Sequence, residues 1–293
     1  MTTQIDASLR QRLTDAQREE ITEHDVYQGL ARRESDAHNR QVLAHIAADE
    51  RKHYEFWAKY TGQHPPRKSL TVWAYLWLAR LLGLTFAVKL MERNERRAQA
   101  AYARVVETIP EAAAVLRDEE THESELTSMI DEERMRYVGS TVLGLSDALV
   151  ELTGALAGFT LALQHTRVIA TIGLITGVAA ALSMAASEYL SSKAEKTGRT
   201  SPSRAALYTG VAYIITVMIL VAPYLILASP LLSLGLTLAG ALVIILAFTY
   251  YVSVAQDLRF APRFAEMAVI SLGVAAVSFA VGYALRVALG VNV

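Results

Sequence analysis

The residues best suited to chemistry are two Glu-x-x-His pairs in the polar first half of the chain. The first pair is Glu50 with His53, and the second is Glu119 with His122. Residues three apart on a helix share a face, so each pair directs a carboxylate and an imidazole toward the same point. Those two groups together suit Fe(II), Mn(II) or Zn(II).

Either pair alone is weak evidence, because a Glu-rich segment contains such pairs by chance, on solvated helix faces. The full set is stronger, since Glu20 and Glu92 each add one carboxylate from a different predicted helix. One Glu from each of two helices and a Glu-x-x-His from each of the others is the ligand set of a di-metal four-helix bundle. We therefore predict a di-iron site, with manganese or zinc as alternatives.

Four helix-forming stretches must position these ligands. A break at Gly62–Pro66 follows the second stretch and leaves a long crossover before the third. The stretches cover residues 14–34, 38–60, 83–107 and 110–135. Four helices with one long crossover predict an all-α bundle.

This region resembles the rubrerythrin branch of the ferritin-like superfamily. Tyr27 follows Glu20 by seven residues, as in that family, and Glu92-Arg-Asn-Glu95 matches its third-helix Glu-x-x-Glu. The resemblance covers about residues 14–135 and implies a ferritin-like fold, a di-iron site with Glu95 as an exchangeable ligand, and ferrous oxidation. The chain has no cysteine, so the rubredoxin-type iron module of that family and its electron delivery are not expected.

The second half of the chain has a different composition. Residues 1–137 carry 43 charged residues and residues 138–293 only 14, which predicts a domain boundary between these two ranges. An apolar helix of about 20 residues crosses the ~30 Å hydrocarbon core, so the second domain is predicted to contain five spans. These are 138–163, 168–192, two spans of about 23 residues on either side of Ala228-Ser229-Pro230, and 267–285.

The short loops predict the orientation. Lys and Arg residues gather before the first span, at 193–204 between the second and third spans, and at Arg259 and Arg263 between the fourth and fifth. All of these loops fall on one side, which the positive-inside rule assigns to the cytoplasm. We therefore expect a multi-pass protein of the cell (inner) membrane, with a cytoplasmic first domain and with Val293 outside.

The apolar segment Leu70–Leu90 is a sixth candidate. It has Trp73 and Trp77 near its start, but Arg80 lies at its centre and Lys89 near its end. These charges favour a buried or interface-lying helix over a membrane span.

Acidic residues inside predicted spans indicate function, because a charge within the bilayer is costly unless it is paired or hydrated. Asp147 and Glu151 are four apart on the first span, and Met184 and Glu188 are four apart on the second. At ~1.5 Å per residue, Asp147 and Met184 reach similar depths near the midplane. Carboxylates and a thioether suit the passage of a transition-metal cation. The alternative is that the acids only bond neighbouring helices and that Met184 only packs.

Two motifs in these spans, Gly144-Leu-Ser-Asp147 and Ser183-Met184-Ala-Ala-Ser-Glu188, resemble the vacuolar iron transporter (VIT/CCC-type) family. The resemblance implies export of Fe(II), and often Mn(II), in exchange for protons, along a path lined by Asp147 and Met184. Plant members carry a Glu-rich metal-collecting segment after the second span. The loop at 193–204 is too short for one, so the first domain is expected to take that role.

The sequence therefore favours a fusion of a ferritin-like domain with a VIT-type transporter domain, similar to the membrane-bound ferritins. We expect a homodimeric Fe(II)/Mn(II) exporter, a transporter and not an enzyme, whose first domain collects, senses or oxidises metal. The alternative is a membrane-anchored di-iron oxidase, although an anchor needs neither midplane acids nor five spans. No basic stripe with aromatic residues is present, so a nucleic-acid partner is not expected.

Overall fold

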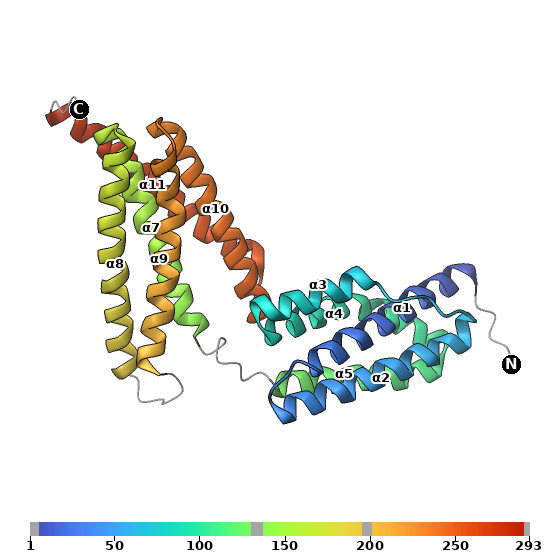
Figure 1. Ribbon diagram of the computed structural model, residues 1–293. Coiled ribbons are helices and arrows are strands. Elements are labelled where there is room, and N and C mark those ends of the chain that lie inside the picture. The colour runs from blue at the N-terminus through green and yellow to red at the C-terminus, as the bar shows by residue number, and fades with distance from the viewer. Residues whose placement is uncertain (1–5, 130–136, 195–200, 290–293) are drawn as a thin grey trace. The chain divides into compact units, whose positions relative to one another are not determined.

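The computed structural model describes residues 6–129, 137–194 and 201–289, except for the side chains of 94–104, 107, 127 and 128. In these ranges the regular structure is helical and no strand occurs, which confirms the predicted all-α class. The chain divides into two compact units, Met1–Met135 and Arg136–Val293 (Figure 1).

The described part of the first unit contains four long helices and a shorter one. The elements are α1 (Ala7–Ala31), α2 (Ala37–Thr61), α3 (Ser69–Leu82), α4 (Leu84–Thr108), the 3-10 turn η1 (Pro110–Ala112) and α5 (Ala113–Ser128). Asp6 and Asp36 cap α1 and α2 by accepting the backbone N–H groups of Leu9 at 2.6 Å and Asn39 at 2.9 Å. Gly62 ends α2 with a φ of 66°, a left-handed conformation that glycine adopts without steric cost.

The apolar segment 70–90 is divided at Gly83, although the sequence suggested a single helix. Gly83 has a φ of 101° and separates α3 from α4. A side chain would be strained at this φ, so the glycine permits the sharp change of direction. The 14 residues of α3 span about 21 Å at 1.5 Å per residue, too short for a membrane span, and α3 forms the crossover to α4.

Two apolar clusters stabilise the first unit. One joins the end of α1, the start of α2 and the end of α5, through Val26, Ile46 and Leu126 among others. The other joins the opposite ends of α1 and α2, through Leu13 and Trp57. The predicted metal ligands of α1, α2 and α5 lie between these clusters in sequence. They therefore form a polar layer between two apolar layers, which keep bulk water away.

The second unit contains five helices that are long and apolar enough to cross a membrane, which confirms the predicted number of spans. They are α7 (Val138–Leu163), α8 (Thr166–Ala194), α9 (Pro202–Ile226), α10 (Pro230–Ala255) and α11 (Phe260–Leu289). The chain is therefore a multi-pass membrane protein.

Helix α7 packs closely against both α9 and α11. A Cβ added at Gly144 would lie 2.3 Å from the carbonyl oxygen of Thr209 on α9. One added at Gly282 on α11 would lie 2.2 Å from the carbonyl oxygen of Gly158. Glycines at these crossings let the backbones touch, as is common between membrane helices. The helix with two predicted pathway acids is thus held centrally in its unit.

Candidate metal centre

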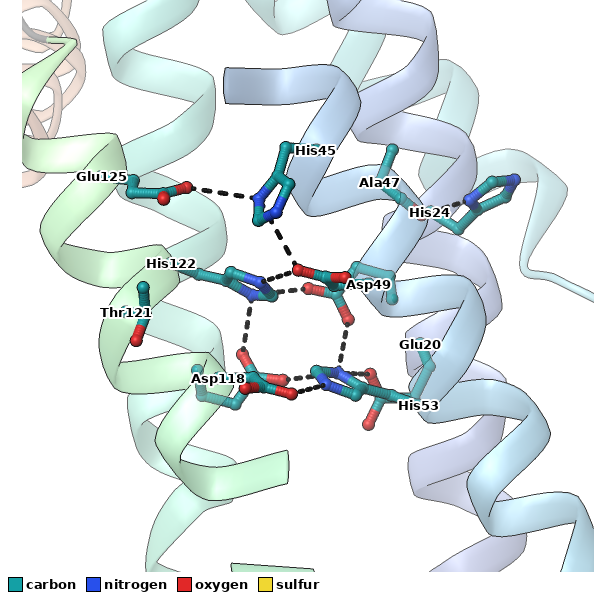
Figure 2. A network of polar contacts seen from close by, with 12 residues as sticks. Glu20, His24, His45, Ala47, Asp49, His53, Asp118, Thr121, His122 and Glu125 are labelled. Carbon is teal, nitrogen blue, oxygen red and sulfur yellow. Dashed lines mark hydrogen bonds and ion pairs between the residues drawn. The ribbon is translucent and has the colours of Figure 1, made fainter. Parts of the chain in front are cut away.

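Five of the seven predicted metal ligands meet in the polar layer of the first unit (Figure 2). Glu20 comes from α1, Glu50 and His53 come from α2, and Glu119 and His122 come from α5. Four of these residues are at most 4% exposed, and only Glu119 is partly accessible. Three helices therefore direct ionisable groups into one buried place, where each must have a charged partner.

His53 lies at the centre of one group of facing carboxylates. Its Nδ1 lies 3.6 Å from Oε2 of Glu20, 3.5 Å from Oε2 of Glu50 and 3.2 Å from Oε1 of Glu119. One ligand atom from each of these four residues lies within 4.8 Å of the others. Ligand atoms about 2.0–2.2 Å from a shared ion are up to about 4 Å apart. A single cation therefore fits among them after small side-chain shifts.

His122 faces two of the same carboxylates from the other side of the layer. Its Nδ1 lies 3.3 Å from Oε1 of Glu50 and 3.9 Å from Oε2 of Glu119. Each of these two carboxylates thus turns one oxygen toward His53 and the other toward His122. The centres of the two imidazole rings are 5.9 Å apart. If metal is bound here, Glu50 and Glu119 would be the carboxylates shared between the two histidines.

Buried polar atoms provide a test of whether the residues fit a metal. In the part of the chain that the structure describes, Oε2 of Glu20, Oε2 of Glu50 and Nδ1 of both His53 and His122 are buried without a hydrogen-bond partner. Nearly all buried polar atoms in proteins have such a partner. Four such exceptions in one layer fit the binding of metal cations there.

Two aspartates orient the histidines from behind. Nε2 of His53 is hydrogen-bonded to Oδ2 of Asp118, and Nε2 of His122 to Oδ2 of Asp49, each at 3.3 Å (Figure 2). An imidazole that donates from Nε2 keeps a lone pair on Nδ1 for a metal. The pairing is crossed, because each aspartate lies on the helix that carries the other histidine: Asp118 on α5 contacts His53 on α2, and Asp49 on α2 contacts His122 on α5. It follows from the antiparallel packing of α2 and α5, in which the start of one helix contacts the end of the other.

Asp49 and Asp118 were missed by the sequence analysis, although a signal was present. The pattern Asp-Glu-x-x-His occurs twice, at 49–53 and at 118–122. An aspartate four residues before a histidine suggests a contact within one helix. Only the tertiary structure reveals that the contact runs to the opposite helix.

Trp57 closes the site next to α1. It is fully buried and donates its indole N–H to Oε1 of Glu20 at 3.0 Å, which leaves Oε2 of Glu20 turned toward His53. A cavity of about 20 Å³ lies beside this pair, with Glu119 and the apolar side chain of Val115 among its lining residues. It has room for about one water-sized molecule.

The electrostatics of the cluster follow from burial and from the facing charges. Burial raises the pKa of Glu20 well above its ordinary value, and the nearby Glu50 adds to this. Burial would also raise the pKa of Glu50, but His122 and His53 outweigh it and lower that pKa to about 2. Burial opposes protonation of His122, yet Glu119 and Glu50 raise its pKa to about 10, and the pKa of His53 is raised in the same way. Protons therefore occupy this site until a cation displaces them.

The other two predicted ligands lie on α4. Glu92 is 2% exposed, and its Oε2 is 3.0 Å from Nζ of Lys89. Among the described residues, no hydrogen bond or ion pair joins Glu92 to His53 or His122. The side chain of Glu95 lies outside the described residues.

The predicted pathway residues of α8 are Met184 and Glu188, and Glu188 is the nearer of the two to the C-terminal end of the helix. Glu188 accepts a hydrogen bond from Ser140 of α7 at 2.6 Å and another from Ser192 at 3.4 Å. Met184 packs against the apolar core of the unit and is half-buried. Both serine hydroxyl groups donate to Oε1 of Glu188, one from α7 and one from α8 itself. The hydrogen bonds given for this carboxylate therefore come from neutral groups.

The predicted pathway residues of α7 are Asp147, which is half-buried, and Glu151, which is exposed on the described chain. Tyr213 of α9 donates its hydroxyl to Oε2 of Glu151 at 2.8 Å. The sequence gave no signal for Tyr213, which is one of many aromatic residues in a charge-free stretch. Among the hydrogen bonds and ion pairs of residues 137–194 and 201–289, none joins Asp147 to Met184.

Fold and site together define a helical multi-pass membrane protein with a buried Glu/His cluster, suited to metal ions, in a separate unit. Within the second unit, residues 138–199 match the model of the VIT family. The matched segment contains α7 and α8 and thus Asp147, Met184 and Glu188, whereas the first unit lies outside it. No curated protein and no solved structure matches the chain.

Proposed function

We propose that this chain is a homodimeric, proton-coupled exporter of Fe(II) and Mn(II), and that its first unit collects the metal. The observation that carries the proposal is the VIT-family match over residues 138–199, which contains the acids of α7 and α8. Apolar spans alone would be consistent with an anchor. An anchor gains nothing from Asp147 or Glu188, because ionisable side chains in a membrane helix are expensive.

The partners of these acids suit reversible binding. Glu188 is hydrogen-bonded to Ser140, and Glu151 to Tyr213, so both carboxylates are held by neutral hydroxyl groups. A hydroxyl donor is displaced more easily than a buried cation, because no opposite charge is left unpaired. Each acid can therefore bind a metal ion from one side and a proton from the other. Asp147, one helical turn from Glu151, is the proposed ligand at the midplane.

The first unit supplies a site of a different kind for the same ions. Carboxylates and imidazoles on three helices provide hard and borderline ligands, which suit Fe(II) and Mn(II). Because the site is preformed and buried, it retains metal at concentrations too low to load the membrane acids. In the proposed function it collects or senses cytoplasmic metal and also has the ligand types of a ferroxidase.

The proposed orientation places the first unit in the cytoplasm and Val293 outside. It depends on the Lys and Arg residues of the short loops, including Arg259 and Arg263. A reporter enzyme that is active only outside the cell, fused after Val293, should be active. Activity of a cytoplasmic reporter at the same position would contradict the orientation.

Metal uptake into proteoliposomes tests the transport itself. The full-length protein should carry Fe(II) and Mn(II) across the bilayer, and a pH gradient of the right sign should accelerate it several-fold. Asp147→Asn protein, which keeps the size of the side chain but loses its charge, is the matched control. Equal uptake by both proteins, or uptake that ignores the pH gradient, would contradict the proposal.

A membrane-anchored di-iron oxidase is the second candidate. It is favoured by one observation, the pair of carboxylates Glu50 and Glu119 that face both histidines in a largely buried layer. Oxygen consumption by the full-length protein on addition of Fe(II) separates the two functions. Rapid consumption that persists in Asp147→Asn and is lost in Glu50→Ala, with no metal transport by the unmodified protein, would replace the exporter with the oxidase.

A further inference from the structure

Helix α3 carries a stripe of large apolar side chains that are exposed in the part of the chain that the structure describes. Leu70 is 79% exposed, Trp73 58%, Trp77 42% and Leu81 64%. The spacing of three, four and four residues places all four side chains on one face of the helix. Large apolar groups in such a continuous row are unusual on a water-facing surface and mark an interaction site.

The opposite face of α3 is fixed to the bundle. Val72 is buried in the apolar cluster of α1, α2 and α5, and Tyr75, Leu76 and Ala79 pack against it. Leu76 also covers Gly29 of α1, where a Cβ would lie 2.8 Å from its side chain. The stripe is therefore presented on a rigid support and not on a loose segment.

The end of the bundle that carries α3 is also the end from which the chain continues to the membrane spans. Met129 belongs to the same apolar cluster as the inner face of α3, so this end of the bundle carries both the stripe and the connection to the spans. Eight residue steps separate Met129 from Tyr137 at the start of α7. A chain of that length reaches at most about 30 Å. The bilayer crossed by the spans is thus always within reach of the stripe.

Charged groups beside the stripe suit a phospholipid surface. A groove of about 520 Å³ lies next to α3, and Arg33, Arg80 and Glu34 line it together with apolar side chains. The Arg80 guanidinium lies 5.6 Å from the centre of the Trp77 ring. Tryptophan and arginine favour the boundary between headgroups and acyl chains, where the ring is buried and the cation meets phosphate.

We propose that α3 is a membrane-docking helix, which lies in the plane of the lipid–water interface and inserts Leu70, Trp73, Trp77 and Leu81. Docking fixes the bundle against the bilayer from which the spans start. Its length of 14 residues suits a helix that lies in the interface better than one that crosses the ~30 Å core. This inference does not depend on which metal, if any, the protein carries.

The three tryptophans of the chain make the test direct. Trp57 is fully buried, Trp73 and Trp77 lie in the stripe, and residues 138–293 contain no tryptophan. The full-length protein is reconstituted in phosphatidylcholine–phosphatidylglycerol vesicles whose lipids carry bromine either near the headgroup or near the acyl terminus. Bromine near the headgroup should reduce the tryptophan emission by roughly twofold, as for interfacial rings. The W73F/W77F variant, which retains only Trp57, should lose this quenching.

A second variant tests docking without changing the fluorophores. In L70E/L81E, two exposed leucines become charged, and lipid quenching should fall while quenching by aqueous acrylamide rises. The Q63E/A114E variant adds the same two charges at exposed positions away from the stripe and should behave like the unmodified protein.

Three outcomes would overturn the proposal. Quenching of the unmodified protein by acrylamide and not by lipid would mean that α3 faces water. Quenching by neither would mean that protein covers the stripe, such as a second copy of this chain. Stronger quenching by bromine near the acyl terminus would mean that α3 enters the hydrocarbon core and does not lie at the interface.

Discussion

The two acidic regions of this protein hold their carboxylates in different ways. In the first unit, Glu50 faces two imidazoles between two apolar clusters, and Glu20 is buried beside it. In the second unit, Glu188 and Glu151 are held by hydroxyl groups of serine and tyrosine. Buried charges with ionic partners are costly to separate, whereas hydroxyl donors exchange readily. The first region is thus suited to retain metal ions and the second to pass them on.

The largest expected effect is the loss of metal transport when a single charge in the second region, that of Asp147, is removed. Asp147→Asn should lower metal transport about 100-fold or more, because the amide cannot neutralise a cation within the membrane. The first unit should still bind two ions per chain, since its ligands lie in a separate compact unit. Uptake into vesicles and elemental analysis of the same preparation measure both properties. Unchanged transport would show that the second region does not hold the ion.

The reverse variant sharpens the same comparison. Glu50→Ala with His53→Ala should abolish metal binding by the first unit and leave transport at high metal concentration. If this variant stops transport at every metal concentration, the first unit does more than collect metal.

Stoichiometry distinguishes the carboxylates within the first region. Glu50→Gln should lose both ions, because its two oxygens face both histidines, whereas Glu20→Gln should lose one, because Glu20 faces only His53. Metal content of the purified full-length protein, measured after loading with Fe(II) or Mn(II), checks this. Equal losses in the two variants would contradict the bridging role of Glu50.

The crossed aspartates should have a smaller effect. Asp118→Asn and Asp49→Asn should each weaken metal binding about 10–100-fold, as is typical for groups that orient a metal-bound histidine. Glu120→Gln removes an exposed acid of α5 beside Glu119 and is the matched control. Titration of the full-length protein with Mn(II) measures the affinity. An effect of Glu120→Gln as large as that of Asp118→Asn would indicate general loss of negative charge and no positioning.

The stability of the first unit should depend on pH in opposite ways with and without metal. His122 has a pKa of about 10 against an ordinary value of 6.5, so its contribution to metal-free stability is complete below pH 6.5 and is lost as the pH rises toward 10. The raised pKa values of His53 and Glu20 act in the same direction. Glu50, with a pKa lowered to about 2 from 4.5, contributes above pH 4.5 and loses this contribution as the pH falls toward 2. Because the raised pKa of Glu20 begins to lower stability above pH 4.5, the metal-free unit should be most stable near pH 4.5. It should lose stability most steeply above pH 6.5, where the histidines add to the loss.

Added metal should reverse the alkaline part of this dependence, because ions replace the protons that the site releases. Tryptophan emission follows the unfolding of the first unit within the intact chain, since all three tryptophans lie there. The metal-free Tm should fall by about 5 °C or more between pH 6.5 and 9, and the increase in Tm on adding Mn(II) should grow over the same range. A metal-free Tm that rises over this range would show that the histidines are not protonated in the folded state.

The smallest expected effect concerns Tyr213 in the second region. Tyr213→Phe removes the hydroxyl that Glu151 accepts and should change the transport rate roughly threefold to tenfold, in line with single hydrogen bonds between membrane helices. Thr216→Val, one turn further along α9, is the control, because its hydroxyl bonds only its own helix backbone at Ala212. Equal effects of the two substitutions would mean that general helix packing, and not the Glu151 contact, sets the rate.

The sequence by itself determined the all-α class, the five spans and five of the Glu and His side chains that meet in the first unit. Each of these depends on a local property. Charge-free stretches of 20 or more residues identify spans, and a spacing of three residues places Glu50 with His53 and Glu119 with His122 on one helix face each. Such patterns are set by helix geometry, which does not depend on how the helices pack.

Only the tertiary structure decided how the helices share these residues. The antiparallel packing of α2 and α5 gives Asp118 to His53 and Asp49 to His122, and the packing of α7 on α9 gives Tyr213 to Glu151. Contacts of this kind join residues more than 60 positions apart in the chain. Sequence periodicity cannot select among the many hydroxyl and carboxyl groups at such separations, because the selection is made by the rotation and register of one helix against another.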